Sequence, residues 1–118
     1  MRGIEGEQAL LRIILSESRM HRGTPLHRVI LDLLRAEGRA GATVLKGQAG
    51  FGSDEDVHTV AIEVAAVGLP IVLEVVDTEA RIAAVLPTLE GVLAGGVVTV
   101  ERARVIRYAG APPIEPIA

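Results

Sequence analysis

The chain has 118 residues, a formal net charge of −3, and neither cysteine nor tryptophan. This length suggests one domain, and a hydrophobic fraction of 49% is too high for a disordered chain. The lack of cysteine excludes disulfides, thiol nucleophiles and zinc–thiolate sites, and the mildly acidic charge argues against a duplex DNA binder.

The first part of the chain is predicted to form a strand and then a helix. Residues 9–16 carry aliphatic side chains on both alternating faces, which is typical of a strand partly buried on each side. Thr24 and Pro25 predict the start of the helix, with threonine as N-cap and proline at the first helical position. Gly38 is the expected C-cap. Helical spacing places one apolar stripe at Leu26, Val29, Ile30, Leu33 and Leu34.

The middle of the chain is predicted to hold further strands separated by loops. Residues 41–49 are a strand candidate, and the glycines of segment 50–52 would break it. Residues 53–58 are acidic and polar, as loops are, whereas residues 59–66 could be extended. Residues 71–76 are aliphatic and β-branched and form the clearest strand of the sequence.

A second helix and a last strand complete the predicted elements. Asp77 and Thr78 offer an N-cap, and apolar residues keep helical spacing from Ile82 as far as the Gly95–Gly96 pair. A final strand is expected from Val97 to about Tyr108.

These elements follow the order β-α-β-β-α-β, which is the ferredoxin-like arrangement of an α+β sandwich: a four-stranded antiparallel sheet with two helices on one face. We expect one domain over residues 1–118, with a core at about 9–109 and a loose tail at 110–118. The helices can cover only one face of the sheet, while the strands are apolar on both. The sequence therefore predicts a homo-oligomer that covers the second face.

The same sequence predicts a cytoplasmic protein that does not span a membrane. No apolar stretch approaches the roughly 20 residues that cross a bilayer. Glu5 and Glu7 lie where a signal peptide would carry its basic and apolar regions. Nucleic-acid binding on the sheet is not expected, because Phe51 and Tyr108 are the only aromatic residues and RNA-reading sheets need aromatics on their central strands.

Several short motifs give the chain a resemblance to a known family. In chain order they are Thr24-Pro25-Leu26, Gly41-Ala42-Thr43-Val44-Leu45-Lys46-Gly47, Gly50-Phe51-Gly52, Leu69-Pro70, Glu74-Val75-Val76-Asp77 and Val105-Ile106-Arg107. Together, over roughly residues 9–109, they resemble the PII signal-protein superfamily. The resemblance is closest to its uncharacterised PII-like branch, domain of unknown function 190.

The resemblance implies a compact homotrimer of ferredoxin-like subunits whose sheets face inward. It also implies ligand clefts between adjacent subunits and a mobile loop, here residues 53–68, that docks on a partner protein. The usual effectors of PII proteins are adenine nucleotides, and their usual partners are channels, membrane transporters and metabolic enzymes. The expected function is therefore that of a PII-like regulator, not an enzyme, that binds a small anionic effector.

Two departures from the PII pattern concern the phosphate contacts. The Gly/Lys-rich loop that holds nucleotide phosphates in PII proteins corresponds here to residues 94–98, which are fewer and include no lysine. The second of the alternating arginines that end the last strand is replaced by Ala109. Both changes remove charge-assisted contacts, so ATP binding of the ordinary PII kind is not expected. The 53–68 loop also lacks a tyrosine, which argues against uridylylation.

The glycine turn and the resemblance together predict a set of ligand-binding residues. An exposed glycine turn offers backbone N–H groups, and an arginine supplies charge for an anion. The predicted contacts are Gly50, Phe51, Gly52 and Arg107, with Lys46 and Arg104 as additional contacts. Structural roles remain open beside these, since Phe51 could fill core at a tight bend.

The arginines of the last strand and the first loop have alternatives of the same kind. Arg102 and Arg104 share one strand face and Arg107 points to the other, so they could also pair with Glu74 or Glu101 on a solvated face. The first loop, with Arg19, His21 and Arg22, could add positive potential to the site or be ordinary solvated surface.

A different site is suggested by the acidic cluster after the glycine turn. Asp54, Asp56 and His58 could hold a divalent metal, because carboxylates suit magnesium and calcium. The alternative function is a metal-binding trimer resembling the divalent-cation-tolerance protein CutA, and the structural alternative is a solvated loop tip. A small enzyme acting in the intersubunit cleft is a third hypothesis, although no acid–base pair or catalytic motif is identifiable.

Overall fold

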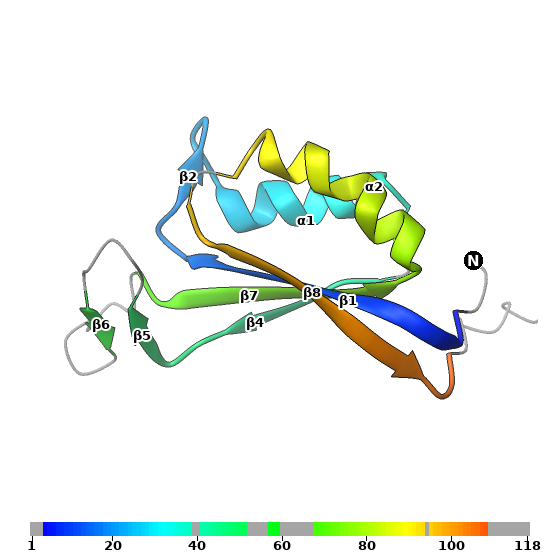
Figure 1. Ribbon diagram of the computed structural model, residues 1–118. Helices are drawn as coiled ribbons and strands as arrows, with labels where there is room; N and C mark the ends of the chain where they lie inside the picture. Colours follow the sequence, from blue (N-terminus) through cyan, green and yellow to red (C-terminus); the bar gives the residue numbers. More distant parts are fainter. Residues whose placement is uncertain (1–3, 39–40, 52–56, 60–67, 94, 109–118) are drawn as a thin grey trace, which may run out of the picture.

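Two helices cover one face of a four-stranded antiparallel sheet (Figure 1). The computed structural model describes residues 4–38, 41–51, 57–59, 68–93 and 95–108. The predicted ferredoxin-like α+β arrangement is confirmed, with the strand order β4-β7-β1-β8. In chain order the elements are β1 (Gly6–Ser16), β2 (Met20–His21), β3 (Thr24–Pro25), α1 (Leu26–Ala36), β4 (Thr43–Lys46), β5 (Ala49–Phe51), β6 (Val57–Thr59), β7 (Pro70–Asp77), α2 (Glu79–Glu90) and β8 (Val97–Val105).

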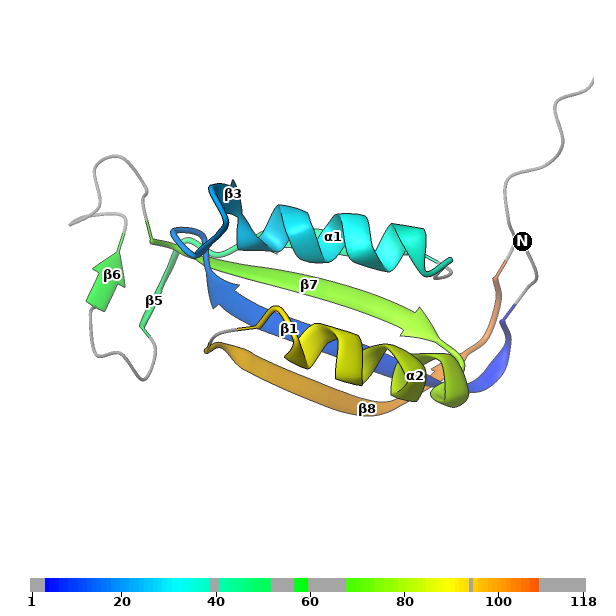
Figure 2. The ribbon, with the colours of Figure 1, turned by 90° about the horizontal axis from the view of Figure 1, so that it is seen from above.

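The central strands β1 and β7 alternate between a buried face and a half-buried face, as the sequence predicts. Their buried side chains face the helices, which run side by side along the sheet (Figure 2). The core lies between these two layers and consists of Ala9, Leu11, Ile13, Leu15, Leu26, Ile30, Leu34, Ile71, Leu73, Val75, Ile82, Val85 and Leu89. Their burial is the main force that fixes the strand register.

The start of α1 differs from the prediction. Thr24 is not the N-cap: Pro25 occupies that position, and no side chain caps the helix. The reason is local, because Thr24 and Pro25 form β3 and pair with β2 across a tight turn in which Arg22 and Gly23 have positive φ angles. The end of α1 lies one residue before the prediction: Glu37 is the C-cap, and Gly38 follows it with a φ of 72° and stops the helix.

The start of α2 is confirmed, because the Thr78 hydroxyl accepts a hydrogen bond from the Arg81 backbone N–H at 3.1 Å. Glu79 lies in the first turn, where the helix dipole favours a carboxylate. The helix runs through Pro87 but ends at Glu90, earlier than the predicted end at residues 95–96.

Asp77 anchors the junction of three elements. Its carboxylate is fully buried; Oδ1 accepts a hydrogen bond from the Thr78 backbone N–H at 2.7 Å, and Oδ2 lies 3.3 Å from Arg81 Nε. The same arginine donates from Nη2 to the backbone carbonyl of Gly38. This group, the Asp77 junction, therefore ties the end of β7 to the start of α2 and the end of α1.

The second half of the sheet departs from the predicted strand boundaries. The strand predicted at 41–49 is divided into β4 and β5 around Gly47 and Gln48. Gly50 and Phe51 do not break a strand, because they belong to β5 and pair with β6. The last strand ends at Val105, before the predicted Tyr108. Residues 60–67 and the predicted tail lie outside the described residues.

No helix among the described residues is long and apolar enough to cross a membrane.

Candidate functional site

One end of the sheet gathers three of the sequence-predicted ligand residues that the structure describes, Lys46, Gly50 and Phe51. We call it the hairpin end, because the β5–β6 hairpin extends from it (Figure 1). The turn that follows β1, residues 16–19, lies there because Ser16 is paired with Pro70, the first residue of β7. The Gly95–Gly96 turn lies there as well, since a side chain on Gly96 would meet the backbone oxygen of Ile14 at 2.7 Å.

Two glycines at the hairpin end pack against the ring of Pro70. A Cβ atom on Gly47 would lie 2.5 Å from Pro70 Cγ, and one on Gly50 would lie 3.1 Å from the same atom. The Gly47 backbone N–H also donates to the Pro70 carbonyl at 2.7 Å. This Pro70 clamp fixes the base of the hairpin, so the described contacts give Gly50 a packing role next to the ligand role that the sequence suggested.

The remaining residues of the glycine turn and the acidic cluster are only partly described. Phe51 pairs with Val57, and Gly50 pairs with His58, across the β5–β6 ladder. Gly52, Asp54 and Asp56 lie outside the described residues. Within the described part of the chain, no group of three or more histidine, aspartate or glutamate residues could hold a metal. The predicted metal ligands therefore stay a prediction.

The cations at the hairpin end differ in their partners. Lys46 Nζ lies 3.0 Å from Glu17 Oε2, so its charge is already compensated. Arg19 lies over Gly95, with Nη2 at 2.5 Å and Cζ at 3.0 Å from the place that a Cβ atom would take. Sequence reasoning gave Arg19 only a general electrostatic role. The signal it missed is the glycine at position 95, which is distant in sequence and leaves room for the guanidinium group.

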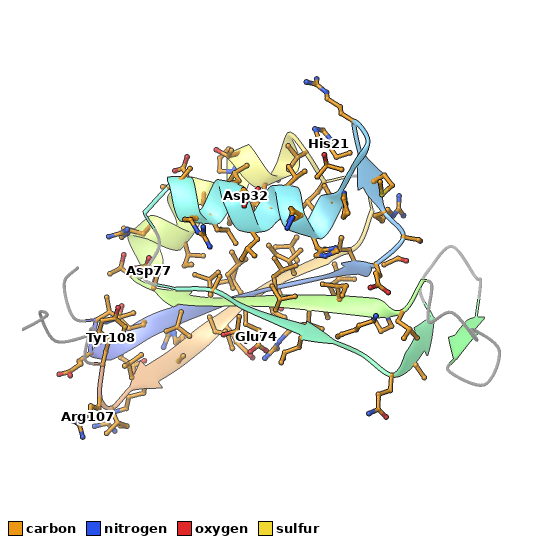
Figure 3. The ribbon with its side chains drawn as sticks, turned by 180° about the vertical axis from the view of Figure 1, so that it is seen from behind. His21, Asp32, Glu74, Asp77, Arg107 and Tyr108 are labelled. Carbon is orange, nitrogen blue, oxygen red and sulfur yellow. The ribbon has the colours of Figure 1, made fainter. Side chains whose placement is uncertain are left out.

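The predicted arginines of the last strand lie at the opposite end of the molecule. Arg104 is paired with Glu7 near the start of β1, on the side of the sheet that the helices cover. Arg107 is exposed beyond β8, and it lies far from the hairpin (Figure 3). The next residue, Tyr108, is held there by a hydrogen bond of 3.1 Å from its backbone N–H to Glu5 Oε2. One chain therefore does not bring Arg107 and the glycine turn together.

A family model, DUF190 (Uncharacterized ACR, COG1993), matches residues 8–105. The chain belongs to this DUF190 family. A UPF0166 protein of Aquifex aeolicus is 31% identical over 100 residues, covering 85% of this chain and 94% of that protein. A UPF0166 protein of Methanocaldococcus jannaschii is 34% identical over 88 residues, covering 71% and 77%. The recognition of domain of unknown function 190 is thereby confirmed.

Solved structures show the same fold. The DUF190 chain is similar to CPII, a nitrogen regulatory PII-like protein from Thiomonas intermedia K12 bound to ADP, AMP and bicarbonate, with a TM-score of 0.60 and 24% identity over 86% of this chain and 90% of that one. A structure of CPII bound to ADP and bicarbonate gives a TM-score of 0.59 at 23% identity.

The open face of the DUF190 sheet, opposite the helices, is apolar with a charged centre. Cross-strand pairing aligns Leu45, Val72, Ile14 and Val97 in one row across all four strands. The neighbouring row contains Arg12 and Glu74, whose Nε and Oε2 atoms are 2.9 Å apart. The members of this row on the edge strands β4 and β8 are exposed to solvent: Leu45 is 48% and Val97 is 53% exposed.

The charged centre corrects one sequence-based interpretation. Glu74 and Glu101 pair with Arg12 and not with the arginines of the last strand, since Arg12 Nη1 also lies 3.2 Å from Glu101 Oε1. The strand register explains this, because Arg102 and Arg104 face the helix side. The hydrogen bond to Glu74, followed by the charges of both glutamates, raises the pKa of Arg12 above its ordinary value.

Proposed function

We propose that this DUF190 protein is a PII-like regulator that assembles as a homotrimer and binds a small anionic effector, such as an adenine nucleotide, in clefts between subunits. The observation that carries the proposal is the separation of the predicted ligand residues. Gly50 and Lys46 lie at the hairpin end of the chain, whereas Arg104 and Arg107 lie at the other. A site that uses both groups must be built from two chains.

The open face supports assembly. A row of aliphatic side chains across four strands, with its end members about half exposed, is a surface that association would remove from water. A second copy of the chain is the occupant that the separated ligand residues require. The likeness to CPII, which was solved with ADP, AMP and bicarbonate, supports the effector class.

We further propose that residues 53–68 report effector binding to a partner protein, such as a membrane transporter, a channel or a metabolic enzyme. The Pro70 clamp supports this role, because it fixes the base of the β5–β6 hairpin beside Lys46 and Gly50, two of the predicted ligand contacts. In this proposal the protein acts by docking in the cytoplasm and catalyses no reaction.

Assembly is tested by two matched variants on β8. Val97 lies on the open face and Val100 on the helix side, and the two are 53% and 48% exposed. Sedimentation equilibrium is expected to give three times the chain mass for the wild type and for Val100→Asp, and a monomer for Val97→Asp. A monomeric wild type would contradict the proposal.

Effector binding is tested by calorimetric titration of the assembled protein with ADP, AMP, ATP and bicarbonate. We expect binding of at least one of these anions, weakened by Arg107→Ala, together with altered hydrogen exchange in residues 53–68. Divalent metals are titrated in parallel after chelation. A response to metals alone, lost in Asp54→Asn, would favour the CutA-like alternative.

A further inference from the structure

The described arginines fall into two groups by burial. Six of them are exposed, whereas the side chains of Arg12, Arg19 and Arg81 belong to half-buried residues. A half-buried guanidinium loses part of its hydration, so a carboxylate or another acceptor normally compensates it. Arg12 has Glu74 and Glu101, and Arg81 has Asp77. Among the described residues, Arg19 is the half-buried arginine that has no carboxylate partner.

The backbone of Arg19 is held in place on both sides. Its N–H donates to the Ser16 carbonyl at 3.1 Å, and its carbonyl accepts from the Leu26 N–H at 2.8 Å. The hydroxyls of Ser16 and Ser18 are also hydrogen-bonded to each other at 2.8 Å. The turn that carries the arginine is therefore fixed before any ligand arrives, which lowers the entropy lost on binding.

The guanidinium rests on a residue that has no side chain. Its Nη2, Cζ and Nη1 atoms lie 2.5, 3.0 and 3.4 Å from the position of a Cβ on Gly95. Any other residue at this position would displace the arginine. Within the described part of the chain, the Gly95 N–H donates to no acceptor. The Arg19 guanidinium and the Gly95 backbone, which come from distant segments of the chain, therefore lie side by side at the hairpin end.

This guanidinium fits an oxyanion. A planar guanidinium can contact two oxygens of one phosphate or carbonate group, and charge-assisted hydrogen bonds of this kind are the strong ones. Lys46 is a weaker candidate, because Glu17 already compensates it. We propose that Arg19, which packs against Gly95, is the oxyanion-binding residue at the hairpin end of this chain.

This inference rests on the proposed function in one respect, since it takes the oxyanion to be part of the effector. The bound group is either the phosphate of a nucleotide or free bicarbonate, and both have oxygens that suit a guanidinium. Separate titrations with ADP, inorganic phosphate and bicarbonate distinguish these sources.

The test compares Arg19→Met with Arg35→Met in the assembled protein. Both variants remove one positive charge. Arg35, however, is an exposed residue in the last turn of α1, at the end of this helix that points away from the hairpin end. Arg19→Met is expected to weaken oxyanion binding roughly 10- to 100-fold, the usual loss for a charged hydrogen bond. Arg35→Met is expected to bind like the wild type.

A second variant tests the contact between the Arg19 guanidinium and Gly95. Gly95→Ala is expected to weaken binding by displacing the guanidinium, but in an Arg19→Met background it should cause no further loss of affinity. The melting temperature without ligand separates this effect from backbone strain, because Gly95 has a φ of 92°. The NMR signal of Arg19 Nε–Hε gives a direct readout, since it should shift when the oxyanion is added to the wild type.

The possible results separate the inference from the proposed function. If ADP binds to Arg19→Met as tightly as to the wild type, the inference is wrong and the proposed function stands. If phosphate binds through Arg19 while no nucleotide binds, the inference stands and the nucleotide effector is wrong. A wild type that binds none of the three anions contradicts both.

Discussion

The two ends of the sheet use arginine in opposite ways. At the Asp77 junction, Arg81 has a buried carboxylate and a backbone carbonyl as partners, so every charge there is compensated within the chain. At the hairpin end, Arg19 is half-buried against Gly95 and has no such partner among the described residues. An arginine whose charge is compensated by a carboxylate of the same chain has a structural role. An arginine that is fixed in place but has no such carboxylate is suited to bind an anionic ligand.

The largest loss of stability is expected when the Asp77 junction loses its buried carboxylate. Asp77→Ala removes the acceptor of the Thr78 N–H and the partner of Arg81. Removing one partner of a buried pair lowers the free energy of unfolding by about 3–5 kcal/mol. Urea denaturation measures this loss, and Asp77→Asn is the control because its amide oxygen can still accept from Thr78. Equal stability of wild type and Asp77→Ala would refute the structural role.

The two glycines beside the uncompensated end should differ in stability. A Cβ on Gly96 would meet the Ile14 carbonyl oxygen at 2.7 Å, and the φ of 84° adds strain. We expect Gly96→Ala to lower stability by about 2–3 kcal/mol. Gly95→Ala should lose about 1–2 kcal/mol, because the neighbouring Arg19 side chain can move away. Thermal unfolding of both variants checks the order, and the reverse order would mean that Arg19 is held rigidly.

A mixing experiment tests whether the two ends of the sheet form one site between subunits of the assembled protein. Arg19→Met and Arg107→Ala each disable a different half of the proposed intersubunit site. When the two variants are unfolded together and reassembled, about a quarter of the clefts should combine two intact halves, as random assembly requires. Calorimetry should detect these recovered sites. No recovery, despite mixed oligomers seen by mass spectrometry, would place both arginines in one site of one chain or in none.

The smallest effect is expected at the charged centre of the open face. Arg12→Met is predicted to lower the free energy of unfolding of the monomeric Val97→Asp background less than any of the changes above, because the pairs with Glu74 and Glu101 are partly solvated. The raised pKa of Arg12 means that this pairing stabilises the fold at every pH below the ordinary arginine value and is lost only in stronger alkali. Stability measured between neutral pH and pH 9 should therefore show no step caused by Arg12.

The sequence predicted the elements that burial determines. The alternation in β7 and the apolar stripe of α1 are visible in the sequence, because buried residues recur at every second position in a strand and at every third or fourth position in a helix. The N-cap at Thr78 was predictable as well, since the cap and its acceptor role are local. The fold class and the family followed from these features and from short motifs.

What the sequence did not predict depends on contacts between distant segments. Thr24 has a good N-cap side chain, but pairing with β2 holds it in a strand. Glycine is typical of turns, but Gly50 lies in strand β5, where it packs against the Pro70 ring. Arg19 and Gly95 are 76 positions apart in the printed chain, and only the shared end of β1 and β8 brings them into contact.

The Pro70 clamp has a consequence for engineering and for divergence within the family. Gly47 and Gly50 both pack against the ring of Pro70 at the start of β7, and the Gly47 N–H donates to the Pro70 carbonyl. These three contacts set the point where the hairpin leaves the sheet. Under the proposed function, a residue 53–68 segment from a relative, joined to the same Pro70 clamp, is expected to transfer specificity for a partner without changing the sheet.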